Sequence, residues 1–170
     1  YQVFPARSEY DLLIWTTNTC EELTSPDEHF SRSAIAYAPF RRHIDFPTVL
    51  CGITKPSVYT GGRPSPQEID PHFGERQPYF VIYPFAKTTD WYLKSREDRQ
   101  ELMNGHITIG RKFPTIQQQL LYSFGIQDQE FIVAYEMDDL PLFSDLVQDL
   151  RATEARLYTL LDTPIITGML

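Results

Sequence analysis

Cysteine and long apolar runs are both scarce in this sequence. Its 170 residues include two cysteines, Cys20 and Cys51, which is too few for the disulfide framework of a small secreted domain. They lack the paired spacing of a cysteine metal site, so we expect both to be free thiols. No apolar run approaches the roughly 20 residues that a membrane-spanning helix needs. The first residues lack the order of a signal peptide, which favours a cytoplasmic location.

Basic residues are also in the minority. The sequence has 15 Lys and Arg against 23 Asp and Glu, which gives a formal net charge of −8. Such a chain repels the phosphates of nucleic acids and the anionic surface of a membrane. We therefore expect neither nucleic acid nor membrane among its partners. The hydrophobic content of 42%, with 14% aromatic residues, is sufficient for a folded core without disulfides.

The first 78 residues carry only short signals of regular structure. An apolar run at residues 9–16 predicts a strand, and the Ser25-Pro26-Asp27-Glu28 start predicts a helix to about residue 38. Residues 48–54 predict a second strand. Residues 55–77 hold four prolines and Gly61-Gly62 without periodicity, which predicts a long loop. Loops of this length in a compact domain are usually functional lids or disordered segments.

Residues 79–170 carry stronger signals. The expected elements are a β-rich run from residue 79 that Pro84 stops, a helix from Ser95 that ends before Pro114, strands at 116–124 and 130–137, a helix from the cap Asp139 through Leu157, and a strand at 163–167. Strand, helix, strand, strand, helix, strand is the ferredoxin-like order. It predicts an α+β fold in which helices cover one face of an antiparallel sheet.

His106 and Glu154 are polar residues at positions that the helical period assigns to apolar faces. Leu102 and Ile109 share the face of His106. A histidine there is either a core residue with a hydrogen-bond partner or a metal ligand. Glu154 follows Leu150 by four residues, and a carboxylate behind an imidazole fixes the tautomer of a metal-bound histidine. The pair indicates a metal or haem site, with ordinary core residues as the alternative.

Several segments of the second half carry a family resemblance. They are Tyr83-Pro84-Phe85-Ala86-Lys87, Trp91-Tyr92, Arg96-Glu97-Asp98-Arg99, Met103-Asn104-Gly105-His106, Gly110-Arg111-Lys112-Phe113, Asp128-Gln129-Glu130-Phe131 and Arg151-Ala152-Thr153-Glu154-Ala155-Arg156. Together they resemble the coproheme decarboxylases of the chlorite dismutase superfamily. The resemblance is specific over residues 79–170 and weaker before residue 79.

The resemblance implies a two-lobed ferredoxin-like subunit of the dimeric α+β barrel type, often assembled as a homopentamer. The N-terminal lobe, residues 1–78, is shortened here and includes the loop at 55–77. The C-terminal lobe, residues 79–170, would hold haem. His106 matches the residue that ligates the iron, and Glu154 matches the acidic residue behind it.

The resemblance also assigns the residue on the opposite side of the porphyrin. Gln119 occupies the distal position thirteen residues after His106, where chlorite dismutases carry an arginine. A neutral amide can hydrogen-bond to a bound peroxide, whereas an arginine would hold anionic chlorite. Without the resemblance, Gln119 is a polar residue on a half-exposed strand.

Other matched residues surround the propionate groups. Tyr83 matches the tyrosine that carries a radical in the decarboxylases, although the sequence alone would make it a packing residue. Lys87 matches the basic residue that orients a propionate, for which an ammonium group is adequate. Further residues matched to porphyrin contacts are Trp91, Arg111, Arg156 and Thr163.

The activity implied is the decarboxylation of coproheme to haem b with hydrogen peroxide as oxidant, so that the porphyrin is both substrate and cofactor. One alternative is a chlorite dismutase or haem peroxidase on the same fold. A second is a non-enzymatic module for haem binding or regulation, since a fold does not fix an activity. The expected partners are iron porphyrin, hydrogen peroxide and further copies of the chain.

Overall fold

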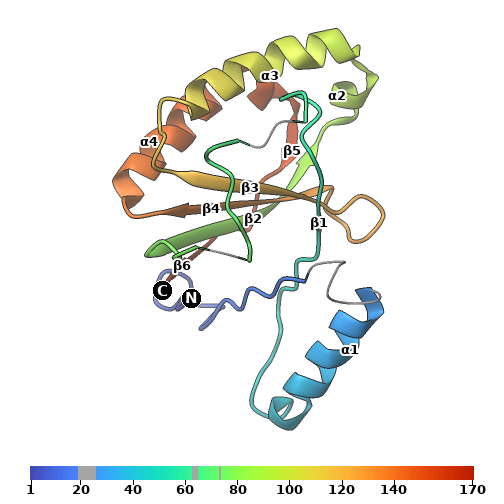
Figure 1. Ribbon diagram of the computed structural model, residues 1–170, viewed down its shortest axis with the longest axis vertical. Helices are drawn as coiled ribbons and strands as arrows, with labels where there is room; N and C mark the ends of the chain where they lie inside the picture. Colours follow the sequence, from blue (N-terminus) through green and yellow to red (C-terminus); the bar gives the residue numbers. More distant parts are fainter. Residues whose placement is uncertain (19–25, 63–64, 73) are drawn as a thin grey trace.

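One antiparallel sheet with helices on one side organises the chain. A computed structural model describes residues 1–18, 26–62, 65–72 and 74–170. Six strands form the sheet in the order β1-β3-β4-β2-β5, with β6 also paired to β2. The two long helices α3 and α4 lie along one face of this sheet, and the N-terminal segment lies along the other (Figure 1).

The second half has the order of elements that the sequence predicts. Its elements are β2 (Tyr79–Lys87), α2 (Thr89–Leu93), α3 (Arg96–Gly110), β3 (Gln117–Tyr122), β4 (Phe131–Met137), α4 (Leu140–Arg151), η2 (Glu154–Tyr158), β5 (Thr159–Leu161) and β6 (Ile166–Met169). The neighbours β3-β4-β2-β6 are those of a ferredoxin-like sheet. The predicted α+β fold class is therefore confirmed.

Both long helices begin where the sequence predicts, because each has a capping side chain. Ser95 Oγ accepts a hydrogen bond from the backbone N–H of Asp98 at 3.0 Å. Asp139 Oδ1 accepts one from Leu142 N–H at 2.9 Å, and this bond satisfies an amide that has no partner within the helix. No described helix is both long and apolar enough to cross a membrane.

The strand β2 continues past Pro84 to Lys87, although we expected the proline to end it. On one side, β2 pairs with β4 along its length, including Pro84 opposite Ile132. On its other side, β6 pairs with β2 only as far as Ile82, and β5 pairs with it only from Ala86. Pro84 falls between those two partners, where no ladder hydrogen bond is lost by its missing N–H.

The helix α4 is shorter than predicted. It ends at Arg151, and the chain then forms the 3₁₀ helix η2 and the strand β5. Thr153 Oγ1 donates a hydrogen bond to Leu150 O at 2.7 Å, which satisfies a carbonyl at the helix end. Leu157, which we expected within this helix, is 76% exposed because the helical period does not continue to it.

The sheet has a different apolar layer on each face. Val81, Tyr135 and Met137 pack against α3 and α4. Phe80 and Ala134, one position away along the same strands, pack with Ile69 of the loop at 55–77 on the opposite face. Because side chains alternate along a strand, these two layers show which face any residue of the sheet occupies.

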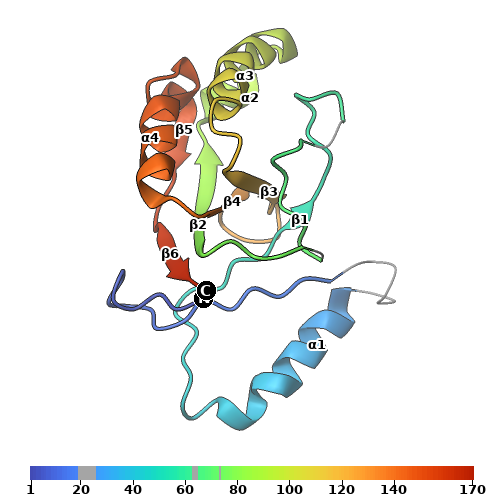
Figure 2. The same ribbon diagram turned by 60° about the vertical axis from the view of Figure 1, so that its left-hand side comes forward.

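The first 78 residues differ more from expectation. The helix α1 (Pro26–Tyr37) is confirmed, followed by η1 (Ala38–Phe40), but Ser25 lies outside the described residues. The run at 9–16 forms only an isolated bridge, Gln2 to Leu12. The predicted strand at 48–54 is reduced to β1 (Ile53–Thr54), which pairs with β3 of the C-terminal sheet. Figure 2 shows α1 standing away from the sheet.

A ferredoxin-like N-terminal lobe is therefore not seen in the described part of residues 1–78, which adds one short strand to the C-terminal sheet instead. Residues 1–18 cover the far face of that sheet, where the rings of Tyr1 and Trp15 stack on Phe80. Cys51 is a half-buried free thiol, as expected, and Cys20 lies outside the described residues.

Candidate functional site

His106 lies on α3 at a position that is mostly closed to solvent. Burial, with a smaller contribution from the ammonium group of Lys87, lowers the pKa of His106 from 6.5 to about 4. The ring is therefore neutral near neutral pH. Its Nδ1 atom is buried and has no hydrogen-bond partner among the described residues. A neutral imidazole with an uncommitted nitrogen meets the chemical requirement of a metal ligand.

Lys87 is held at the end of β2 by three kinds of contact. Its Nζ donates a hydrogen bond to Ala155 O at 3.3 Å and lies 4.4 Å from the ring centroid of Trp91. Its backbone N–H donates to Glu130 Oε2 at 2.7 Å, and Tyr92 OH donates to the same oxygen. Burial and then the charge of Arg156 lower the pKa of Lys87 to about 8. Among the described residues no carboxylate forms a salt bridge with this ammonium group, although the charge of Glu130 raises its pKa, so a carboxylate ligand could supply an ion pair.

Tyr83 is partly buried on the helix-covered face of β2. Its ring stacks on that of Tyr135, with 6.3 Å between centroids. Burial raises the pKa of Tyr83 well above its usual value, and Tyr135 and the charge of Asp162 raise it further. Tyr83 also lines a cavity of about 400 Å³ between the sheet and α4, with Arg151 at its polar side. The phenol is thus kept protonated beside a group of charged residues.

Asp162 connects that group. Its Oδ2 accepts an ion-paired hydrogen bond from Arg156 and lies 3.0 Å from Arg151 Nη2. The structure therefore brings together Lys87, Arg156, Asp162 and Tyr83 along one side of β2. Arg151 and Asp162 are not among the residues that the sequence predicts for the site. Arg151 is the first residue of the segment 151–156 that resembles the family, so it could have been predicted from the sequence. Asp162 lies outside every segment that resembles the family, so nothing in the sequence indicated it.

Gln119 does not lie with Tyr83, Lys87 and the Arg156–Asp162 pair. Gln119 pairs with Ala134, whose side chain belongs to the layer on the far face of the sheet. Directly opposite residues of an antiparallel pair share one face, so Gln119 points away from His106. Its side chain is 5% exposed, and Oε1 has no partner among the described residues. This placement differs from the expectation that Gln119 faces a ligand bound opposite His106.

Three other matched residues are exposed. Glu154 lies in η2, beyond the end of α4, and does not bond to His106 Nδ1, because the helical stripe that would carry it there stops at Arg151. Arg111 follows the last turn of α3, and Thr163 precedes a cis-proline. Trp91, in contrast, is buried at 3% exposure beneath Lys87.

The surfaces that face each other across the site retain exposed apolar area. No residue of the 15-residue helix α3 is fully buried: Leu102, Met103 and Ile109 are half-buried, and Ile109 packs against the core beneath the helices. On the sheet, Leu120 of β3 is 41% exposed on the face that α3 covers. Exposed apolar surface on α3 and on the strand β3 that faces it, next to the imidazole of His106, is suited to a flat apolar group such as a porphyrin.

The loop at 55–77 joins this helix to the edge of the sheet. Gln67 Nε2 donates to three carbonyls beyond and at the end of α3, those of Gly110, Phe113 and Ile116, at 3.3, 2.9 and 3.0 Å. The backbone N–H of Gln118 donates to Gln67 O at 2.7 Å. Earlier in the loop, Tyr59 O accepts from Gln100 Nε2 of α3 at 3.2 Å. The loop is thus an ordered connection in its described parts.

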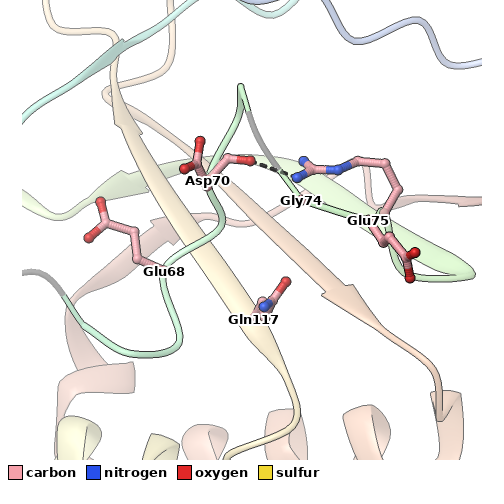
Figure 3. A pocket seen from close by; sticks show the side chains of 6 residues that line it. Glu68, Asp70, Gly74, Glu75 and Gln117 are labelled. Carbon is pink, nitrogen blue, oxygen red and sulfur yellow. Dashed lines mark hydrogen bonds between the residues drawn. The ribbon is translucent and has the colours of Figure 1, made fainter.

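A second cavity, of about 280 Å³, lies on the far face of the sheet. It is lined by Glu68, Asp70, Gly74, Glu75, Arg76 and Gln117 (Figure 3). Gln117 pairs with Glu136, a wholly buried carboxylate that accepts a 2.7 Å hydrogen bond from Tyr1 and lies 3.6 Å from Arg76. No group of three metal-ligating side chains occurs among the described residues. This cavity is separated from His106 by the sheet.

Comparison with known proteins gives one family. The model of the chlorite dismutase family matches residues 1–170. A coproheme decarboxylase from Mycolicibacterium smegmatis is 32% identical over 176 residues, which is 99% of this chain and 70% of the relative. The named relatives are therefore enzymes.

Solved structures agree. A crystal structure of a protein assigned as a chlorite dismutase matches with a TM-score of 0.72 and 30% identity over 85% of this chain and 66% of that one. A mutant chlorite dismutase from Candidatus Nitrospira defluvii matches with a TM-score of 0.73 and 26% identity over 83% and 62%. The chain thus spans slightly less than two thirds of the solved structures that it matches. It belongs to the chlorite dismutase family.

Proposed function

We propose that this chain binds iron porphyrin and catalyses the decarboxylation of coproheme to haem b, with hydrogen peroxide as oxidant. The observation that carries the proposal is that Tyr83 and Lys87 both lie on β2 beside the Arg156–Asp162 ion pair, with Lys87 close enough to His106 to lower its pKa. The 32% identity to a coproheme decarboxylase supports the same reaction.

In this proposal, His106 holds the iron through a neutral ring nitrogen, and burial keeps that ring unprotonated. Lys87 offers an ammonium group to a propionate, and Arg156 adds a second positive charge nearby. The anionic propionate would stabilise both cations, because the site otherwise contains more positive charge than it pairs. These contacts would bring a propionate carboxylate toward Tyr83.

Bound iron porphyrin supplies the oxidising power when it reacts with peroxide. Conversion of one propionate to a vinyl group releases carbon dioxide, a proton and two electrons, and the two electrons reduce one peroxide to water. Tyr83 would pass the electron of its hydroxyl to the oxidising group that bound iron porphyrin supplies and its proton to the water formed from peroxide, and it would recover a hydrogen atom from the propionate side chain. Its raised pKa keeps that hydrogen on the oxygen in the resting protein.

Chlorite chemistry is the second candidate on this fold. A permanent cation beside the iron would hold chlorite, but β3, Gln117–Tyr122, contains neither arginine nor lysine. We therefore favour decarboxylation. We also propose that the chain assembles with copies of itself, because the family that it resembles often forms homopentamers.

The test is Tyr83→Phe, which removes one phenolic oxygen and retains the packing of the ring. The matched control is Tyr79→Phe, which changes a half-buried tyrosine on the same face of the same strand. Each protein is loaded with coproheme and treated with stepwise hydrogen peroxide, and the porphyrin mass is followed. We expect the parent and Tyr79→Phe to lose carboxyl groups and Tyr83→Phe to bind coproheme without losing any. Equal conversion by Tyr83→Phe would refute the assigned role.

A further inference from the structure

The end of the strand β2 receives little support from the sheet at Lys87. On one side, the ladder with β4 ends at the pair of Phe85 and Phe131. On the other side, the register of the ladder with β5 shifts between Ala86 and Lys87, because Leu160 is an extra residue in β5. Lys87 therefore lies beside a β-bulge, where regular pairing is interrupted and the direction of a side chain can change.

The carboxylate of Glu130 takes the place of the missing ladder. Its Oε2 accepts a hydrogen bond from the backbone N–H of Lys87 at 2.7 Å and a second one from the hydroxyl of Tyr92. The backbone N–H of Glu130 donates to Phe85 O at 3.2 Å, which holds Glu130 next to β2. Hydrogen bonds to a carboxylate are stronger than those between neutral groups, so this one side chain secures the end of β2.

Glu130 also secures the helix α2, which supports the other end of the Lys87 side chain. Tyr92 belongs to α2 and directly follows Trp91, whose ring centroid lies 4.4 Å from Lys87 Nζ. With five residues, α2 is too short to be stable without contacts to the rest of the protein. The hydrogen bond from Tyr92 to Glu130 supplies such a contact, and the ring of Tyr92 packs edge-on against Phe124 of the same hairpin. The backbone and the ammonium group of Lys87 are thus both held through Glu130.

We infer that Glu130 is a positioning residue of the proposed porphyrin site: its carboxylate fixes the backbone of Lys87 and the helix beneath its ammonium group, so that Lys87 is directed toward a propionate. The inference rests on the proposed function, because it requires Lys87 to bind a propionate. Burial and the charge of Arg156 lower the pKa of Lys87, and the charge of Glu130 opposes them. Glu130 therefore also favours the charged form of Lys87 that a propionate would bind.

The experiment compares two forms of one porphyrin. Ferric coproheme carries free propionates, whereas its methyl ester has the same ring and no carboxylate charge. The dissociation constants of both are measured by absorption titration, and the ratio of the ester value to the acid value reports how strongly the protein recognises a carboxylate. A residue that only stabilises the fold changes both constants together and leaves the ratio unchanged, whereas a residue that positions Lys87 changes the ratio.

The variants are Glu130→Ala, Lys87→Met and the two combined, with Asp128→Ala as the control at an exposed carboxylate of the same hairpin. We expect Lys87→Met and Glu130→Ala each to lower the ratio about tenfold, which corresponds to the loss of one hydrogen bond to a charged group. The combined variant should lower it no further than Lys87→Met alone, because Glu130 acts through Lys87. Asp128→Ala should have the ratio of the parent.

Two milder variants keep the test decisive if Glu130→Ala does not fold. Tyr92→Phe removes one donor to the carboxylate and keeps the ring, and Glu130→Gln keeps an acceptor oxygen without the charge. Both should lower the ratio, but by less than Lys87→Met. An unchanged ratio in Glu130→Ala, or in both milder variants, would overturn the inference. A further fall in the combined variant, or an equal fall in Asp128→Ala, would also overturn it.

Failure of the proposed function gives a different result. If the parent does not bind coproheme, or if Lys87→Met has the ratio of the parent, Lys87 does not bind a propionate, and the inference falls together with the proposed function. If Lys87→Met lowers the ratio and Glu130→Ala does not, the proposed function stands and only the role of Glu130 is refuted.

Discussion

At the scale of single residues, burial sets the charge of the groups around the site. Desolvation is the largest cause of the lowered pKa values of His106 and Lys87 and of the raised value of Tyr83. All three are thereby moved toward their neutral forms. A ligand that brings negative charge, such as a propionate, would restore the favourable charged state of Lys87.

The lowered pKa of His106 has a consequence for stability. His106 binds a proton near pH 6.5 in the unfolded chain but only near pH 4 in the folded protein. Between these pH values, protonation of His106 therefore favours the unfolded chain. The stabilisation is complete above pH 6.5 and is lost as the pH falls toward 4. The apo protein should therefore lose stability over this interval, by on the order of 3 kcal/mol at most from His106 alone.

The measurement is urea unfolding of parent and His106→Leu across that interval, with His43→Leu as the control at an exposed histidine. The unfolding free energy of the parent should fall relative to that of His106→Leu as the pH falls from 6.5 toward 4, because leucine at position 106 cannot take up a proton. The control should run parallel to the parent. Parallel curves for all three proteins would show that His106 is not buried as a neutral ring.

Which of the site residues lie together could be predicted from the sequence only where a local motif carried them. Lys87 and Trp91 lie within the segments that resemble the family, and they meet in the structure. Gln119 was placed by counting from His106, but the face of a strand depends on its register with β4, which that count does not contain. Glu154 was assigned by extending a helical period beyond the real end of α4.

At the scale of elements, the helices and the hairpin were predictable because their signals are local. Ser95 and Asp139 cap their helices through bonds to residues three positions away. The course of β2 past Pro84 was not predictable, since it depends on where β5 and β6 leave a gap beside it. The bounds of β1 likewise depend on pairing with a strand far along the chain.

The loop connection at Gln67 yields an element-scale prediction. Gln67→Ala removes the side-chain donor that serves the carbonyls of Gly110, Phe113 and Ile116. We expect the variant to unfold about 1–3 kcal/mol more easily, because buried acceptors would lose their partner. Urea unfolding measures the change, with Gln148→Ala, an exposed glutamine of α4, as the control. Equal stability of Gln67→Ala and parent would show that the loop does not secure the end of α3.

At the scale of the whole molecule, considerable apolar surface lies outside the core. Phe30, Ile35, Phe40 and Val49 are each more than half exposed, on and after the helix α1 that stands away from the sheet in Figure 2. Contiguous exposed apolar surface usually marks an interaction site. Two of these side chains lie on a short amphipathic helix that the described residues leave without a partner layer.

We expect this surface to be covered by further copies of the chain. Light scattering of the purified protein should give a mass that is a multiple of 19.8 kDa. Ile35→Glu and Phe30→Glu should lower that mass toward a single chain without unfolding it, since both side chains are already exposed. A strictly monomeric parent protein would contradict the expected assembly.

The central claim is that His106 holds the iron of a porphyrin, and one absorption titration tests it most directly. Coproheme is added to parent, His106→Gly and His106→Gly supplied with free imidazole. We predict a histidine-ligated spectrum for the parent, loss of that spectrum in the variant, and its return with imidazole, because the small ring fills the space left by the side chain. A spectrum in His106→Gly identical to that of the parent, without imidazole, would contradict the account.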